Sequence, residues 1–236
     1  MPPKIIEIKK ELRIKGSLEK ADILRRFFKT GKGQYGEGDR FLGVVVPDQR
    51  KIAIKFGDLS TKEVELLVES PYHEERLTGL LILISKFSKA KKEDKEKIYN
   101  FYLKHTKWIN NWDLVDLTAP NIVGEYLKDK DKTMLMKLAY SKDLWERRIA
   151  ILSTFAFIKD RKHEETLRIS RILLKDNNDL IHKAVGWMLR EVGKRCGEEK
   201  EEEFLQKHYK TMPRTMLRYA IERFPEEKRK SYLNKK

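Results

Sequence analysis

The fold is decided by five segments that align with one another along the chain: EERLTGLLIL (74–83), NNWDLVDLTA (110–119), WERRIAILST (145–154), IHKAVGWMLR (181–190) and TMLRYAIERF (215–224). Their sixth position recurs at intervals of about 35 residues. It is always compact and is occupied by Gly79, Val115, Ala150, Gly186 and Ala220. Small residues that recur at one helix position permit close helix crossings, so this spacing indicates a repeated helix pair.

A repeat of this length is typical of an α-solenoid, in which each helix pair buries its apolar face only against its neighbours. HEAT units fit better than tetratricopeptide units, because the Trp…Leu-Gly…Tyr pattern of the latter is absent. We therefore predict an all-α α-solenoid of HEAT-like helix pairs that forms a curved single domain with a concave basic cleft. The domain would cover residues 1–236, with N-terminal helices and a Gly-rich loop in 1–46 and the repeats in about 47–236.

Apolar periodicity and capping signals define the helices. Pro47 suits the first turn of a helix, where its missing N–H costs nothing. Ser60 and Ser70 are candidate N-caps, and Ser60 with Glu63 has the spacing of a capping box. The tail 226–236 is interpreted as a solvated helix end. Helices are predicted over 4–15, 18–29, 46–56, 60–69, 71–88, 93–105, 111–118, 131–140, 143–158, 163–174, 178–195, 198–209 and 213–223.

The composition is strongly basic. Lys and Arg number 52 against 37 Asp and Glu, which gives a formal net charge of +15. Such an excess favours a polyanionic partner, because each neutralised phosphate releases a counterion; a lysine-rich proteome or a heat-adapted surface is the alternative. The N-terminus MPPKIIEIKKEL has no apolar signal region, and no run approaches a membrane span. We therefore expect no membrane partner and a location in the bacterial or archaeal cytoplasm.

One repeat column carries candidate chemistry. The seventh position of the aligned segments places Asp116, Ile151 and Trp187 on one inner surface, so that a carboxylate and an indole lie two repeats apart. Trp112 lies four residues before Asp116 and shares its helix face. Taken singly, each tryptophan is better explained by core packing, and Asp116 by a solvated or capping carboxylate. The balance is reversed only when Trp112, Asp116, Arg148 and Trp187 are taken together in the sequence contexts of the resemblance described next.

Three elements resemble the AlkD family of DNA alkylation repair glycosylases: Asn111-Trp112-Asp113-Leu114-Val115-Asp116, Trp145-Glu-Arg-Arg148-Ile-Ala-Ile and Ala184-Val-Gly-Trp187-Met-Leu-Arg-Glu191. Each is moderately specific, and together, with correct spacing, they are strongly specific. FLGVVVPDQR (41–50) also matches, so the resemblance covers nearly the whole chain. It implies a HEAT-like fold and a monofunctional DNA glycosylase, which is a hydrolase.

The resemblance also implies roles for single residues. The family's catalytic aspartate falls on Asp116, and its backbone-contacting arginine falls on Arg148. Its two lesion-flanking tryptophans fall on Trp112 and Trp187. A base alkylated at a ring nitrogen is already cationic and leaves readily, so the sugar develops oxocarbenium character. Asp116 can stabilise this charge, or it can orient and deprotonate the attacking water.

The implied reaction is hydrolysis of the N-glycosidic bond of cationic N3- or N7-alkylated purines in duplex DNA, which leaves an abasic site. Enzymes of this type work without deep base flipping, unlike most glycosylases. A neutral damaged base would be a poor substrate, because the leaving group receives little help.

Further contacts with DNA are predicted at Phe27, Arg147 and Lys183. Phe27 stands where a relative has a tyrosine near the lesion, and this leaves the lesion preference open. Lys183 and Arg147 share a repeat column and would line the cleft, although Arg147 could instead form an inter-repeat ion pair.

No cofactor and no metal are expected. Cys196 is the single cysteine, and its setting at a helix end indicates a structural thiol. The histidines show no metal-ligand spacing. The motif Gly31-x-Gly33-x-x-Gly36 does not lie in a βαβ unit, so a dinucleotide site is rejected. Its loop, 30–39, could instead face DNA through Lys32 and Tyr35.

Two other functions stay open. A member of the same fold without catalysis would be a nucleic-acid-binding HEAT-repeat scaffold. A HEAT scaffold that binds protein, with an incidental basic surface, is the third possibility. The presence of Trp112, Asp116, Arg148 and Trp187 favours the enzyme. Its partner would be double-stranded DNA with alkylated bases, with no obligate protein partner and a monomeric state.

Overall fold

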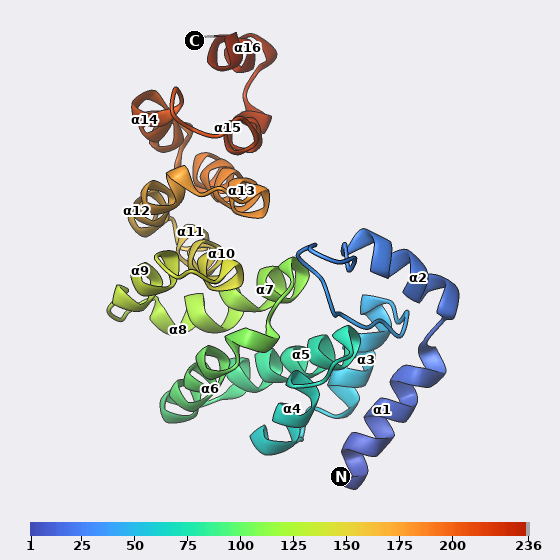
Figure 1. The fold of residues 1–236 in the computed structure, drawn as a ribbon. Coiled ribbons are helices and arrows are strands. Elements are labelled where there is room, and N and C mark those ends of the chain that lie inside the picture. Colours follow the sequence, from blue (N-terminus) through green and yellow to red (C-terminus); the bar gives the residue numbers. More distant parts are fainter. Residues whose placement is uncertain (235–236) are drawn as a thin grey trace. The chain divides into compact units, whose positions relative to one another are not determined.

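The computed structural model describes residues 1–234, and every regular element within this range is a helix (Figure 1). The predicted all-α class is therefore confirmed. The chain divides into two compact units, unit 1 (Met1–Leu114) and unit 2 (Val115–Lys236). The curved single domain with a concave cleft stays a prediction. None of the described helices has the length and apolarity needed to cross a membrane.

Unit 1 is built around α5 (His73–Lys89), whose middle, LTGLLIL, is buried on nearly all sides. Helices α3 and α4 pack against α5, and α1 packs against α3. An apolar helix of this kind must be covered by its neighbours, which explains its central place. The other helices are α1 (Pro3–Lys15), α2 (Leu18–Phe27), α3 (Val46–Lys55), α4 (Thr61–Val68), α6 (Lys92–Lys104), the short 3₁₀ turn Thr106–Trp108 and the beginning of α7 (Trp112–Ala119).

The capping predictions in unit 1 have mixed outcomes. Ser60 and Glu63 form the predicted capping box at the start of α4, and Pro47 lies in the first turn of α3. Ser70 was expected to cap the next helix, but α5 begins only at His73 and its N-cap is Tyr72. The Ser70 hydroxyl instead accepts the Tyr72 N–H at 3.1 Å and donates to the Glu75 carboxylate at 2.7 Å.

Unit 2 contains a succession of helix pairs along the chain. Helix α10 packs against α9 and α13, and α13 packs in turn against α12, α14 and α15. The elements are the rest of α7, a π-helical turn Pro120–Gly124, α8 (Glu125–Leu127), α9 (Thr133–Ala139), α10 (Leu144–Ser153), α11 (Phe155–Lys159), α12 (Glu164–Ile172), the 3₁₀ turn Leu173–Lys175, α13 (Asp179–Cys196), α14 (Glu198–His208), α15 (Arg214–Ala220), the 3₁₀ turn Ile221–Arg223 and α16 (Glu226–Asn234).

The predicted helix 143–158 is divided in the structure. It ends at Ser153 and resumes as α11, because the Thr154 hydroxyl donates to the Ile151 carbonyl at 2.6 Å and the backbone turns there. A side chain that competes in this way for backbone groups favours a helix end. The π-helical turn that begins at Pro120 was not predicted; proline lacks the N–H that would continue the regular ladder of α7.

The solvated-tail interpretation needs correction within the described residues. After Pro225 the chain begins a separate helix, α16, and Tyr232 is 9% exposed. Its ring lies 5.4 Å from Tyr209 and 5.9 Å from Phe224. The tail therefore packs onto the end of unit 2; Lys235 and Lys236 lie outside the described residues.

The aligned segments occupy α5, α7, α10, α13 and α15, and their compact column lies at helix crossings. A Cβ atom at Gly79 would lie 2.9 Å from Leu67 Cβ on α4. A Cβ atom at Gly186 would lie 2.4 Å from the Met216 carbonyl on α15. The predicted close crossings are confirmed at both glycines. The next column, which contains Asp116, Ile151 and Trp187, does not form a uniformly accessible surface, because Ile151 is fully buried.

A buried acid in unit 2 gives a stability prediction. Glu201 on α14 is 2% exposed, and burial, with the charge of Glu198, raises the pKa of Glu201 to about 8. Since this value lies above that of the unfolded chain, stability falls as the pH rises from about 4.5 to about 8. We expect Glu201→Gln to raise the free energy of unfolding by about 2 kcal/mol near pH 9 and hardly at all near pH 5.

The measurement is urea unfolding at both pH values. Glu203→Gln, which removes an exposed carboxylate from the same helix, serves as the control. An equal effect of Glu201→Gln at pH 5 and pH 9 would contradict the assignment of a buried, neutral carboxyl group.

Candidate functional site

In unit 2, Asp116 on α7 forms a bidentate ion pair with Arg148 on α10. Arg148 Nε and Nη2 each donate to one carboxylate oxygen at 2.8 Å. Arg148 Nη1 donates to the Leu180 carbonyl at 2.5 Å. Arg148 is 5% exposed, whereas the side chain of Asp116 is 16% exposed. The planar guanidinium thus fixes both oxygens of a carboxylate that solvent can still reach.

The other basic residues predicted for unit 2 have acidic partners of their own. Arg147 Nε donates to Asp176 at 2.6 Å, which is the inter-repeat ion pair named above as the alternative. Lys183 Nζ lies 2.7 Å from Asp179, one turn earlier on α13. Trp187 is half-buried on α13, and its ring centroid lies 6.2 Å from that of Phe155.

In unit 1, the structure brings Phe27 and Trp112 together. Phe27 ends α2 and is 60% exposed. Its ring lies 5.8 Å from the Trp112 ring in an edge-to-face arrangement. On its inner side, Trp112 packs against Phe28 at 5.2 Å, within a small core that also contains Ala21 and Phe41. An exposed aromatic ring and a half-buried one therefore share one surface of unit 1.

The Gly-rich loop 30–39 folds back onto the end of α2. Gly36 N donates to the Lys29 carbonyl at 3.2 Å, and a Cβ atom at Gly36 would lie 2.3 Å from the Phe28 carbonyl. Only glycine permits this approach. The loop connects two helices, and the described part of the chain contains no strand beside it, so the glycines do not lie in a βαβ unit.

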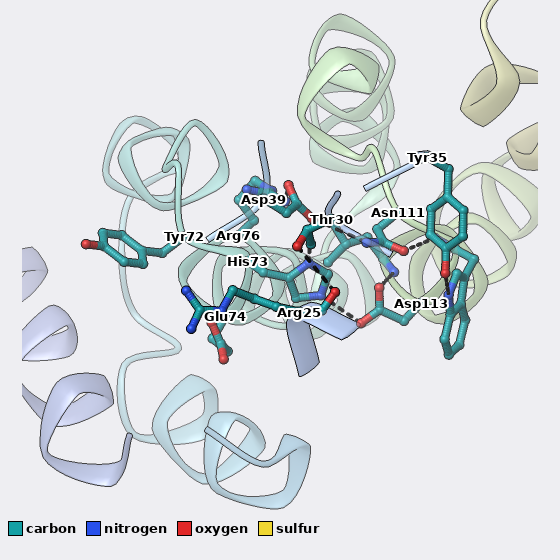
Figure 2. A network of polar contacts seen from close by, with 12 residues as sticks. Arg25, Thr30, Tyr35, Asp39, Tyr72, His73, Glu74, Arg76, Asn111 and Asp113 are labelled. Carbon is teal, nitrogen blue, oxygen red and sulfur yellow. Dashed lines mark hydrogen bonds and ion pairs between the residues drawn. The ribbon is translucent and has the colours of Figure 1, made fainter. Parts of the chain in front are cut away.

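A buried polar network lies beneath this loop (Figure 2). His73 Nδ1 lies 3.2 Å from Asp39, and His73 Nε2 lies 2.8 Å from Asp113. Asp39 also accepts hydrogen bonds from Arg76 at 2.6 Å and from Asn111 at 3.3 Å. His73 and Arg76 are each 2% exposed. Two acids and two bases therefore meet in the interior of unit 1.

His73 is held in its charged form. Burial disfavours the imidazolium, but the charge of Asp113 and the hydrogen bonds with Asp113 and Asp39 outweigh it and raise the pKa of His73 to about 9. The ring also lies between Phe41, at 4.7 Å, and Phe28, at 5.0 Å, whose π-faces favour a cation. Although burial opposes its charge, Asp39 has a lowered pKa because of its hydrogen bond with His73.

This charge state predicts a pH dependence of stability. The folded-state pKa of His73 lies above the reference value of 6.5, so the stabilisation is complete below pH 6.5 and is lost as the pH rises through about 9. We expect this change of pH to lower the free energy of unfolding by about 3 kcal/mol. Urea unfolding near pH 6 and pH 9.5 measures it, and His73→Gln should remove the part of this difference that belongs to His73, while the part that Glu201 contributes remains. If the free energy of unfolding of His73→Gln depended on pH as steeply as that of the parent protein, the assignment of a charged His73 would be refuted.

Sequence reasoning missed this network. Arg76 was not among the predicted site residues, and no pattern connected it with Asp39 or with His73. The available signal was Asp113, the first acid of the Trp112-Asp113-Leu-Val-Asp116 element, whose carboxylate contacts His73.

One group of side chains in the described residues has ligand atoms close enough together to hold a metal. Glu65, Glu69 and His105 have such atoms within 4.8 Å of one another. However, His105 Nδ1 lies 2.7 Å from the Phe101 carbonyl, and Nε2 lies 2.9 Å from Glu65. Glu65 also pairs with Lys104 at 3.4 Å. Ion pairs within the protein account for this cluster.

Residues 8–224 match the family described as DNA alkylation repair enzyme. The chain belongs to this family. The predicted family resemblance is thereby confirmed over most of the chain. No curated protein matches.

Two solved structures resemble this DNA alkylation repair protein in fold. A predicted DNA alkylation repair enzyme from Enterococcus faecalis is 15% identical, with a TM-score of 0.70 over 90% of this chain and 98% of that one. AlkD2 from Streptococcus mutans is 16% identical, with a TM-score of 0.55 over 88% of this chain and 98% of that one.

Proposed function

We propose that this DNA alkylation repair protein is a glycosylase that hydrolyses the N-glycosidic bond of cationic N3- or N7-alkylated purines in duplex DNA. It would leave an abasic site and would not draw the base into a deep pocket. Double-stranded DNA with alkylated bases is its proposed partner, and the net charge of +15 supports a polyanionic substrate.

The Asp116–Arg148 pair carries the proposal. Nε and Nη2 of a 5% exposed arginine hold a solvent-accessible carboxylate, with one hydrogen bond to each oxygen. The carboxylate keeps a full negative charge and is 16% exposed, so it can face a water molecule or a developing positive charge. Because the side chain is already fixed, the reaction would require little reorganisation of this group.

The proposed chemistry follows from the charge of the lesion. An alkylated purine carries a positive charge and departs as a neutral base, so its departure leaves positive charge on the deoxyribose. Asp116 stabilises that sugar cation, or orients and deprotonates the water that attacks it. Arg148 acts here as a positioning residue for Asp116. The phosphate contact that the family resemblance implies for Arg148 stays a separate prediction.

The aromatic residues would form the surfaces on which the lesion rests. Phe27 and Trp112 contact each other in unit 1 and offer π-faces to a cationic nucleotide. Trp187, on α13, stays a predicted lesion contact that rests on the family resemblance. Lys183 and Arg147 stay proposed DNA contacts. To bind phosphate, Lys183 must leave its ion pair with Asp179, and Arg147 must leave its ion pair with Asp176.

Base release tests the proposal directly. The protein is incubated with duplexes that carry one 7-methylguanine or, for comparison, one uracil, and the free base is measured. We expect 7-methylguanine to be released faster than in buffer, while uracil, a neutral base, is retained. Equal release of 7-methylguanine with protein and with buffer, despite binding of the duplex, would instead favour a non-catalytic nucleic-acid-binding scaffold.

A salt titration tests the partner independently of catalysis. Several phosphate contacts should make the logarithm of the DNA association constant fall steeply with the logarithm of the salt concentration. A flat dependence would favour a protein-binding scaffold with an incidental basic surface.

A further inference from the structure

Three consecutive residues around the start of α7 are connected to the Gly-rich loop, Asn111 and Trp112 directly and Asp113 through His73 on α5. Asn111 Nδ2 donates to Asp39 at 3.3 Å. Trp112 Nε1 donates to the Tyr35 hydroxyl at 3.3 Å. Asp113 accepts from His73, whose other ring nitrogen faces Asp39. Consecutive residues on a helix point in different directions, so three separate contacts fix this helix end from three sides.

The two ends of this arrangement differ in burial. Asp39 is 7% exposed and belongs to the charged interior, so it anchors the loop. Tyr35 is half-buried, and its hydroxyl group contacts the Trp112 indole (Figure 2), which itself contacts the exposed Phe27. The loop therefore extends from a rigid buried network to the aromatic surface of unit 1.

The Tyr35 hydroxyl connects the two aromatic residues of that surface. It accepts the Trp112 indole N–H and lies 3.4 Å from the Phe27 carbonyl, to which it donates. The Tyr35 hydroxyl group thus donates a hydrogen bond to the last residue of α2, Phe27, and accepts one from the first residue of α7, Trp112. Removing the oxygen would release the indole N–H and the Phe27 carbonyl together.

We propose that Tyr35 is a positioning residue that presets the Trp112 indole against Phe27 and thereby increases the preference for alkylated over undamaged DNA. The consequence for DNA rests on the proposed function; the coupling of Tyr35 to Trp112 does not. A side chain that is oriented before binding loses less conformational freedom in the complex, so preorganisation raises affinity for the ligand it fits.

The first arm of the test measures the coupling without DNA. In a ¹⁵N-labelled protein, the indole N–H signal of Trp112 is assigned by its disappearance in Trp112→Phe. We expect Tyr35→Phe to shift this signal and to speed its exchange with water. Tyr140→Phe removes the hydroxyl of a 74% exposed tyrosine in unit 2 and should leave the signal unchanged. An unchanged Trp112 signal in Tyr35→Phe overturns the proposal.

The second arm measures the ratio of the affinities for a 7-methylguanine duplex and its undamaged counterpart. One hydrogen bond of this kind predicts a decrease of about fivefold in this ratio for Tyr35→Phe. In a double-mutant cycle, Tyr35→Phe should have no further effect once Trp112 is phenylalanine. An equal loss of affinity for both duplexes would mean that Tyr35 contacts DNA directly, and would overturn the positioning role.

The two arms separate this inference from the glycosylase proposal. If the parent protein releases no base but the indole signal shifts, the glycosylase proposal fails and the coupling stands. If base release is robust but Tyr35→Phe changes neither the signal nor the affinity ratio, the positioning role fails and the glycosylase stands.

Discussion

Asp116→Asn is expected to lower the single-turnover rate of 7-methylguanine release by about 100-fold to 1000-fold. The amide is neutral, so it cannot offset the positive charge that develops on the sugar or accept a proton from water. It is nearly isosteric with the carboxylate, and its single oxygen can still accept a hydrogen bond from Arg148. The chemistry is therefore affected more than the shape of the site.

The control for this experiment is Asp129→Asn. The side chain of Asp129 is 91% exposed and lies 3.9 Å from Lys162 in unit 2. We expect excision by this variant to stay within about threefold of the parent protein, because an exposed ion pair has little energetic weight. Circular dichroism checks the folding of both variants. A folded Asp116→Asn protein with undiminished excision would place the chemistry on another residue.

Asp39→Ala is expected to lower the free energy of unfolding by about 3–5 kcal/mol, because it leaves buried charges without their partner. Asp39 accepts from Arg76 at 2.6 Å and contacts His73 at 3.2 Å, and both bases are 2% exposed. The loss of the carboxylate would leave the interior with two bases and only the charge of Asp113 to offset them.

Urea unfolding at pH 7 measures this effect. The control is Asp58→Ala, which removes an exposed acid that pairs with Lys4 on the surface of the same unit, and no measurable change is expected there. The change in Asp39→Ala should also appear as faster amide exchange in loop 30–39, since that loop loses its anchor. Comparable stability of the two variants would contradict a structural role for the network.

The repeat explains why the fold could be predicted. Two of the five compact positions, Gly79 and Gly186, have no room for a larger side chain because a neighbouring helix lies against them. Because the helix pairs repeat, compact residues recur along the sequence at the same spacing as the repeat, and this pattern can be recognised without a structure. Breaks without such a signal were missed: Thr154 divides a helix through one side-chain hydrogen bond, and Pro120 begins a π-helical turn inside a hydrophobic run.

The site was predictable only in part. Sequence elements singled out Asp116, Arg148 and Trp112 as candidate site residues, but they did not predict the contacts of these residues. Nothing in the sequence pairs Arg148 with Asp116, 32 residues away, or directs Tyr35 to the Trp112 indole. These contacts depend on tertiary packing and on the course of a glycine-rich loop, and neither leaves a periodic signature.

The bidentate contact between Asp116 and Arg148 has an evolutionary consequence. Loss of the acid alone would strand an arginine that has almost no access to water, and loss of the arginine alone would leave the acid without its support. Single replacements at either position should therefore be purged, and the two positions should change together. Descendants that have abandoned catalysis are expected to have exchanged both residues for a compatible, uncharged pair.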